Sequence, residues 1–180
     1  MTRVVLTYKE YEALPADGRR YEIHDGELSV TPAPSLQHQS VSRNLFRIVD
    51  VHVRAKGIGE VWFAPLDVIL SDTSIVQPDI VYVDPTRLDA ASQRGIEGPP
   101  TLAVEILSPS TTLIDRVAKP QLYARHGVPY FWLVDPAGRM IEAFVLGPDG
   151  YALAARASGR QPLDLPPFTD LGLVPESLWP

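Results

Sequence analysis

The chain has 180 residues, of which 45% are hydrophobic and 21% charged, and its net charge is −6. This length and composition are typical of one globular domain and exclude a disordered chain. The absence of cysteine excludes disulfides, thiolate metal sites and a cysteine nucleophile. The acidic charge argues against an extended nucleic-acid-binding surface, but it is compatible with a small acidic metal site in a locally basic groove.

The sequence shows no sign of export or membrane insertion. No apolar run approaches the roughly 20 residues of a membrane helix. The opening MTRVVLTYKEYEALP lacks the apolar core and cleavage site of a signal peptide. We therefore expect a cytoplasmic protein with no membrane partner. We also expect a single domain over residues 1–180, with residues 160–180 as a proline-rich tail packed on it.

The first third of the chain predicts two helices and a hairpin. Thr7 suits the N-cap of a short helix, YKEYEALP, ending near Pro15. The stretch RRYEIHDGELSVTP predicts a hairpin with Asp25-Gly26 at its turn. In SLQHQSVSRNLFRIVDVHVRAKG, apolar residues at positions 41, 45, 48, 49 and 53 have helical spacing, and Gly57 is a natural stop.

Strands dominate the remainder of the chain. EVWFAP, LDVIL, QPDIVYVD and TLAVEIL have the character of strands, and a helix is expected from about Thr111 to His126, closed by Gly127. PYFWLVDP and MIEAFVLGPDGYALAA predict further strands, the latter turning at Pro148-Asp149-Gly150. The pattern predicts an α/β domain whose mixed sheet lies between an N-terminal helix and the helix after Glu105.

Two carboxylates break the apolar pattern of these strands. Glu105 lies within LAVEIL, and Asp79 follows Pro78 at the head of DIVYVD. A buried carboxylate is costly unless it is paired, protonated or bound to a cation. Two that point to the same side of neighbouring strands can both stay ionised around a divalent cation, and oxygen ligands suit Mg²⁺ or Mn²⁺. The alternatives are a turn-capping Asp79, and a Glu105 that pairs with a core arginine or lies on an exposed edge strand.

The helix after Glu105 carries a lysine that could reach the same place. Asp115, Lys119 and Tyr123 are spaced i, i+4, i+8 and share one face. A lysine there could hold a scissile phosphate or orient an attacking water. The alternative is an ordinary ion pair between Asp115 and Lys119 on a solvated face.

The order of these stretches along the chain is similar to that of a known protein family. QPDIVYVD, then AVEILSPSTTLIDRVAKPQLYARHGVPYFWLVDP, with YEIHDGEL upstream, resemble the Uma-two family of endonucleases from about Tyr8 to Pro136. That family belongs to the PD-(D/E)XK superfamily of restriction-endonuclease-like folds. The resemblance implies a central mixed sheet flanked by helices, Mg²⁺ (or Mn²⁺) bound by Asp79 and Glu105, and a nucleic-acid substrate, DNA in particular. It also implies a homodimer, so that two sites act on two strands.

The superfamily's usual lysine lies two residues after the glutamate, where this chain has Leu107. The resemblance implies that Lys119, on the following helix, takes over its role. Pro120 lies directly after Lys119, and a proline inside a helix removes a backbone hydrogen bond. We therefore expect a kink that re-aims the lysine.

Further candidates lie upstream. Glu22 in YEIHDGEL and His38 at the start of the long helix match the family's elements and, with Asp115, are possible additional site residues, as a third ligand or a water-positioning group. The alternatives are a cross-strand ion pair of Glu22 with Arg20 or another base, and a His38 bonded to backbone. The other histidines, at positions 24, 52 and 126, are expected at the surface or in packing, and Phe131 and Trp132 in the core.

The preferred interpretation is a metal-dependent endonuclease that hydrolyses phosphodiester bonds, with Lys119 stabilising charge on the phosphate. The first alternative is a catalytically inactive nuclease-fold protein used for binding or as a scaffold, which the acidic charge and Leu107 favour. The second is an acid/base enzyme acting on a small molecule such as a carbohydrate, with Asp79 and Glu105 as its carboxylate pair.

Overall fold

The computed structural model describes residues 4–109 and 112–180. The helices and strands along the chain are α1 (Tyr8–Glu12), β1 (Arg20–His24), β2 (Glu27–Thr31), α2 (Leu36–Lys56), β3 (Glu60–Phe63), β4 (Val68–Ser71), β5 (Ser74–Val76), β6 (Ile80–Val83), the 3₁₀ helix η1 (Pro85–Ala90), β7 (Ala91–Ser92), β8 (Gly95–Glu97), β9 (Leu102–Ile106), the π-helical segment η2 (Ile114–Ala118), α3 (Lys119–Arg125), β10 (Tyr130–Asp135), β11 (Met140–Gly147), β12 (Gly150–Ser158) and the 3₁₀ helix η3 (Pro175–Leu178). Most predicted elements are present, whereas the short strands β5, β7 and β8 were missed.

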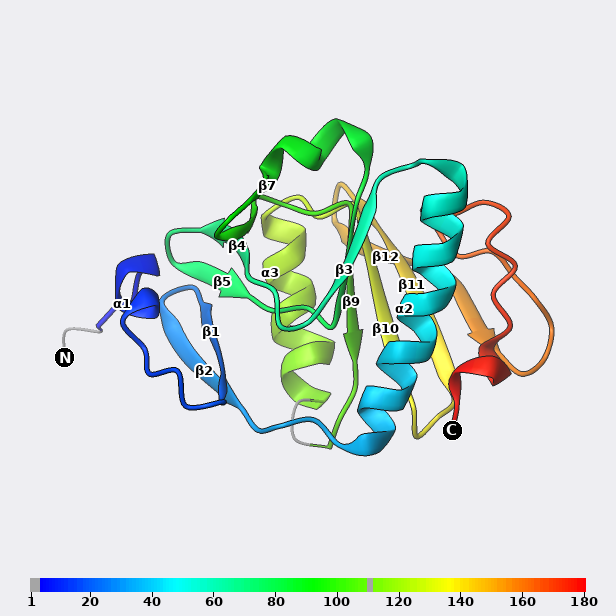
Figure 1. The fold of residues 1–180 in the computed structure, drawn as a ribbon, viewed down its shortest axis with the longest axis horizontal. Coiled ribbons are helices and arrows are strands. Elements are labelled where there is room, and N and C mark those ends of the chain that lie inside the picture. Colours follow the sequence, from blue (N-terminus) through cyan, green and yellow to red (C-terminus); the bar gives the residue numbers. More distant parts are fainter. Residues whose placement is uncertain (1–3, 110–111) are drawn as a thin grey trace.

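The strands of the described residues form two mixed sheets (Figure 1). The small sheet has the order β2-β1-β5-β4-β8-β7, and the large sheet has the order β12-β11-β10-β9-β6-β3. Each contains one parallel pair, β4 with β8 and β9 with β10, among antiparallel pairs. The α/β class and the mixed sheet between helices are confirmed. The division into two sheets was not predicted, because strand partners are chosen by tertiary packing.

The large sheet is covered on both faces. Buried residues of α2 and of the C-terminal segment pack with Val104 and Ile106 on one face. Leu122 and Tyr123 of α3 pack with Ala103 and residues of the small sheet on the other. Because side chains alternate along a strand, Glu105 shares the α3 face with Ala103. The strand is buried on both faces, which explains its nearly continuous apolar sequence.

Local sequence signals place the predicted N-terminal elements. Asp25 and Gly26 both have positive φ, which is the geometry of a tight hairpin turn between β1 and β2. Helix α2 begins after Ser35, whose hydroxyl accepts a hydrogen bond from the His38 N–H at 3.2 Å, and it ends at Gly57 in the left-handed conformation. The predicted hairpin and long helix are therefore confirmed.

The helix after β9 contains a π-helical turn. Its predicted start, Thr111, lies outside the described residues, as does Ser110. The backbone N–H of Lys119 donates to the carbonyl of Ile114, five residues earlier. Pro120 follows in the first turn of α3, directly after the π-helical segment. Proline has no backbone N–H to donate, and in the first turn of a helix that loss is tolerated. The kink expected at Pro120 stays a prediction.

The C-terminal segment contributes to the core. Leu165, Phe168, Leu173 and Leu178 are buried beside α2 and the large sheet. The indole N–H of Trp132 donates to the Pro166 carbonyl at 2.6 Å. Among the described residues, no helix combines the length and apolarity needed to cross a bilayer.

Candidate active site

The two carboxylates predicted to meet lie on adjacent strands. In the antiparallel pairing of β6 with β9, Ile80 lies opposite Val104, which sets Asp79 opposite Glu105. The Asp79 N–H donates to the Val104 carbonyl at 3.0 Å and fixes this register. Both side chains are almost fully buried, at 4% and 2% exposed.

Glu105 is held from the α3 side. Its Oε1 lies 3.0 Å from Lys119 Nζ and accepts a hydrogen bond from the Tyr123 hydroxyl at 2.5 Å. Both of these hydrogen bonds go to Oε1, and no described residue donates a hydrogen bond to Oε2. Strand β9 lies inside the sheet, so the exposed-edge alternative for Glu105 is wrong. The cation that pairs with Glu105 is Lys119 from the following helix and not a core arginine.

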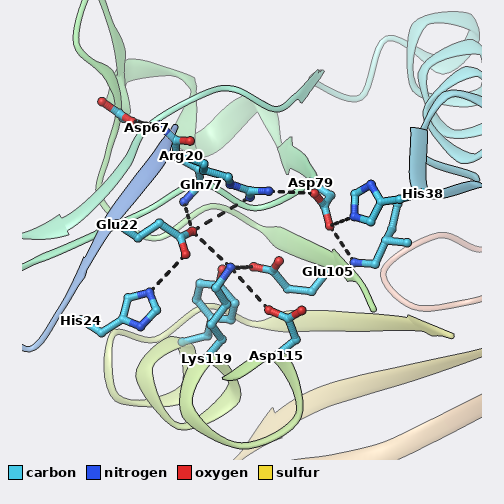
Figure 2. Close-up of polar contacts among 12 residues, drawn as sticks. Arg20, Glu22, His24, His38, Asp67, Gln77, Asp79, Glu105, Asp115 and Lys119 are labelled. Atoms are coloured by element: carbon cyan, nitrogen blue, oxygen red, sulfur yellow. Dashed lines mark hydrogen bonds and ion pairs between the residues drawn. The ribbon is translucent and has the colours of Figure 1, made fainter. Parts of the chain in front are cut away.

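Asp79 is held from the opposite side. Its Oδ2 accepts the backbone N–H of Ile106 at 2.7 Å and lies 3.2 Å from His38 Nε2, while Oδ1 lies 3.2 Å from Arg20 Nη1 (Figure 2). The backbone bond of His38 is made by its own N–H to the N-cap Ser35, which leaves the imidazole ring to face Asp79. His38 thus orients Asp79 from α2.

Lys119 lies at the centre of three carboxylates. Its Nζ is 3.0 Å from Glu105 Oε1, 3.1 Å from Glu22 Oε1 and 3.6 Å from Asp115 Oδ1 (Figure 2). Lys119 and Asp115 are each 3% exposed, so the alternative of a solvated ion pair is wrong. Lys119 follows directly after the π-helical turn, and its side chain contacts residues of β1 and β9.

Glu22 connects the two sheets at this site. Besides Lys119, its carboxylate lies 3.3 Å from His24 Nε2 and accepts the Gln77 N–H at 2.6 Å. Its distance to Arg20 Nη2 is 4.0 Å, so Arg20 is the most distant of its three basic partners, and the alternative of an ion pair with another base agrees with the contacts to Lys119 and His24. The hairpin of the small sheet is therefore tied through Glu22 to the helix of the large sheet.

All six predicted site residues line one cavity of about 210 Å³. They are Glu22, His38, Asp79, Glu105, Asp115 and Lys119. The loop of residues 31–35 and the Ser108-Pro109 turn form its rim. The structure thus brings the predicted residues together; their roles in catalysis and metal binding stay a prediction.

Negative charge exceeds positive charge in this cavity. The four carboxylates of the cavity face two permanent cations, Arg20 and Lys119, which leaves a charge of −2 when all four are ionised and the histidines are neutral. Burial raises the pKa of Glu105 to about 8; the Lys119 ammonium opposes this rise, and the neighbouring carboxylates reinforce it. A divalent cation would remove the imbalance.

The other charged groups are stabilised in their ionised forms. Burial alone would raise the pKa of Asp79, but the hydrogen bond from His38 and the Arg20 charge lower it below its usual range. The pKa of Glu22 is likewise lowered, since Lys119 and His24 outweigh the effect of burial. Burial would lower the pKa of Lys119, yet the surrounding carboxylates raise it. Among these carboxyl groups, Glu105 has the shift that favours its protonated form.

The donor set suits a hard cation. Carboxylate oxygens are the ligands preferred by Mg²⁺ and Mn²⁺, and Glu105 Oε2 is available beside Asp79. In the described residues, no three side chains of the His, Asp or Glu type are already arranged around one point as metal ligands. Lys119 and Arg20 instead occupy positions between the carboxylates. The residues fit a metal chemically, and binding would require these cations to yield part of their contacts.

Three contributors to the site were missed by sequence reasoning. Arg20 was considered only as a partner of Glu22, His24 was expected at the surface or in packing, and Tyr123 was recognised only as sharing the face of Lys119. The alternation of Arg20, Glu22 and His24 along one strand is a signal that was available, because alternate residues point to the same face. Their convergence with α3 depends on how the two sheets meet.

Comparison with known proteins agrees with this architecture. The family model Uma2, described as "Putative restriction endonuclease", matches residues 8–176. The crystal structure of "a putative nuclease belonging to DUF820" from Anabaena variabilis has a TM-score of 0.74 to this chain, with 19% identity over 96% of this chain and 97% of that one. No match was found among curated proteins. Because the family model spans nearly the whole chain, this protein belongs to the Uma2 family, the Uma-two family that its sequence resembles.

Proposed function

We propose that this protein is a nuclease that hydrolyses phosphodiester bonds of DNA with Mg²⁺ or Mn²⁺ bound by Asp79 and Glu105. The observation that carries this proposal is the position of Lys119 Nζ, 3.0 Å from Glu105 Oε1 in a cavity that Asp79 also lines. A lysine from the following helix thereby supplies the charge that the usual strand position, occupied by Leu107, cannot supply. Membership of a family described as restriction endonucleases supports the same chemistry.

The metal would be held by Asp79 and by Glu105 Oε2. A bound Mg²⁺ or Mn²⁺ supplies Lewis acidity and lowers the pKa of coordinated water. On the protein side, His38 and the Ile106 N–H hold Asp79, while Tyr123 holds Glu105. These contacts fix the two carboxylates in place before substrate arrives, as preorganised metal ligands require.

Lys119 and Arg20 are the cations available to a phosphate. In the proposed reaction a water oxygen forms a bond to phosphorus, and the bond from phosphorus to the leaving sugar oxygen breaks. Lys119, which faces the cavity, stabilises the negative charge that develops on the phosphate oxygens. Arg20 Nε and Nη2 are buried and have no hydrogen-bond partner among the described residues, so a phosphate oxygen can satisfy them only when the Arg20 side chain shifts toward the cavity.

The test is a cleavage assay with the purified protein on single-stranded, duplex and branched DNA, with Mg²⁺, with Mn²⁺ and with EDTA. We expect cleavage that requires metal and is lost in Glu105→Ala and in Lys119→Ala. Cleavage in EDTA, or equal cleavage by Glu105→Ala, would contradict the proposal. A matched control is Glu142→Ala, which removes a carboxylate paired with Arg116 and Arg156 outside the cavity.

A second candidate is a nuclease-fold protein that binds DNA without cutting it. The observation in its favour is that Lys119 and Arg20 lie where a metal would have to enter, with no preformed group of three ligands among the described residues. Calorimetric titration with Mn²⁺ separates the two candidates. Binding that disappears in both Asp79→Asn and Glu105→Gln supports the nuclease, and the absence of binding supports the second candidate.

We also propose that the protein acts as a homodimer, which would present two such cavities to two DNA strands. Strand β2 is an edge of the small sheet, and its Leu28 and Val30 are exposed. An unpaired edge with apolar side chains can be covered by a second copy. Light scattering during size-exclusion chromatography would give the mass, and Val30→Lys should shift it toward the monomer.

A further inference from the structure

A second cavity of about 380 Å³ adjoins the candidate active site. The two cavities share Arg20, His38 and Asp79, together with the loop of residues 32–34, so they meet at the carboxylate proposed to bind metal. Its volume is within the roughly 300–1,000 Å³ of small-molecule sites. A group bound in it would lie next to whatever occupies the active-site cavity.

The lining of this second cavity differs from that of the active site. Three prolines, Pro32, Pro34 and Pro65, and the aromatic ring of Phe63 give it flat apolar walls, and Gln39 adds an amide at its side. Phe63 is 57% exposed although it is a large apolar residue. One edge of its ring is supported by Phe46, at 4.8 Å between ring centroids in a T-shaped arrangement. Its exposed ring is therefore held in place.

Positive charge is available beside this cavity. Arg43 lies one helical turn after Gln39 on α2, so the two side chains project from the same flank. Arg43 is exposed and forms no ion pair with a described residue. Arg20, at the boundary between the cavities, has two donors without a described partner. Flat apolar walls with flanking arginines are the chemistry that binds single-stranded nucleic acid, through base stacking and phosphate contacts.

We propose that the second cavity receives the unpaired base and sugar of the nucleotide next to the phosphate in the active site, with Phe63 stacking on the base and Arg43 contacting the neighbouring backbone; this assignment rests on the nuclease function proposed above. A base within a duplex is stacked and paired, so it cannot enter such a cavity without leaving the helix. The preferred substrates are therefore single-stranded DNA and duplexes with an unpaired nucleotide at the cleavage position.

The test is a binding measurement that does not need catalysis. A short single-stranded DNA carries the fluorescent base 2-aminopurine at successive positions, and it is titrated with the protein in Ca²⁺ and in EDTA. We expect one position at which fluorescence falls, because the base stacks on Phe63. Phe63→Leu should abolish that quenching and weaken binding about tenfold, whereas Phe63→Trp should keep both. Phe63→Leu retains an apolar contact to Phe46, and its thermal unfolding checks that the fold is intact.

Two further variants sharpen the result. Arg43→Gln should weaken binding and reduce the slope of log affinity against log salt by about 0.7, the value for one phosphate contact on a single strand. Leu153→Ala removes an exposed apolar side chain from β12, the opposite edge strand of the large sheet, and should change neither measurement. Quenching that survives in Phe63→Leu, or a fully paired duplex that binds as tightly as the single strand, would overturn the proposal.

Failure of this proposal and failure of the nuclease function give different results. If the protein quenches 2-aminopurine through Phe63 but cleaves no DNA, the nucleotide-binding proposal stands and the nuclease function is contradicted. If the protein cleaves duplex and single-stranded DNA equally and Phe63→Leu does not change binding, the nuclease function stands and the nucleotide-binding proposal is contradicted.

Discussion

Lys119 Nζ lies 3.0 Å from Glu105 Oε1, although the two residues come from different elements, the helix after β9 and β9 itself. In the superfamily pattern that this chain resembles, the lysine and the acid share one strand. Here Leu107 occupies that strand position and packs in the core on the α3 face. The following helix instead brings Lys119 to the Glu105 carboxylate from a different part of the chain.

Replacing Lys119 with Met should lower both stability and activity. The substitution leaves buried carboxylates without their central cation, which costs about 3–5 kcal/mol in the free energy of unfolding. Loss of the charge that stabilises the phosphate should lower kcat by about 100-fold or more. Urea unfolding and the cleavage assay measure the two effects. A Lys119→Met protein with wild-type cleavage would remove Lys119 from the proposed mechanism, and Lys119→Arg tests whether charge alone is sufficient.

Glu105→Gln should alter how stability depends on pH in metal-free buffer. The pKa of Glu105 is about 8 in the folded protein, against its ordinary value of 4.5, so the folded state holds an extra proton between these two pH values. Its contribution to the free energy of unfolding is therefore present at low pH and is lost as pH rises toward 8. Urea unfolding in EDTA at several pH values should give a flatter profile for Glu105→Gln than for the wild type. Identical profiles would show that Glu105 is ionised throughout.

Asp79→Asn is the matched substitution with the opposite expectation. Burial is outweighed by His38 and Arg20, which lower the pKa of Asp79, so its carboxylate stabilises the fold above the ordinary value near 3.8. Asparagine removes the negative charge and places an amide among the donors from Arg20, His38 and the Ile106 N–H. The free energy of unfolding should fall by about 3 kcal/mol at neutral pH. The difference from wild type should shrink as pH falls through the folded pKa. Equal stability of Asp79→Asn and Glu105→Gln at neutral pH would contradict this contrast.

Tyr123→Phe should weaken metal binding without abolishing it. The Tyr123 hydroxyl donates to Glu105 at 2.5 Å, and partners of this kind typically change metal affinity by about 10–100-fold. Calorimetry with Mn²⁺ measures the change. Tyr151→Phe is a suitable control, because it removes a partly buried hydroxyl that lies away from the cavity and donates to the Val128 carbonyl at 2.6 Å. Equal effects of the two substitutions on Mn²⁺ affinity would contradict a positioning role for Tyr123.

The candidate site was predicted well where its residues violate a local pattern. Glu105 and Asp79 stand out because carboxylates are rare in apolar strands, and Lys119 stands out through its helical spacing from Asp115. Arg20 and His24 do not stand out, since charged residues are ordinary in a hairpin. The sequence therefore reveals charged groups whose apolar neighbours already predict an unfavourable burial. It does not reveal charged groups that become buried only when the hairpin packs against α3.

Short-range sequence signals account for the local elements: the Asp25-Gly26 turn, the capped helix α2, and strands whose apolar content marks them as buried. These follow from backbone preferences and from periodicity, which act over a few residues. Three features became visible only in the folded protein: the strands form two sheets, carboxylates from three segments enclose Lys119, and a second cavity with Phe63 adjoins the site. The physical reason is that burial and charge pairing depend on residues far apart in the chain, and their energies are defined only once those residues meet.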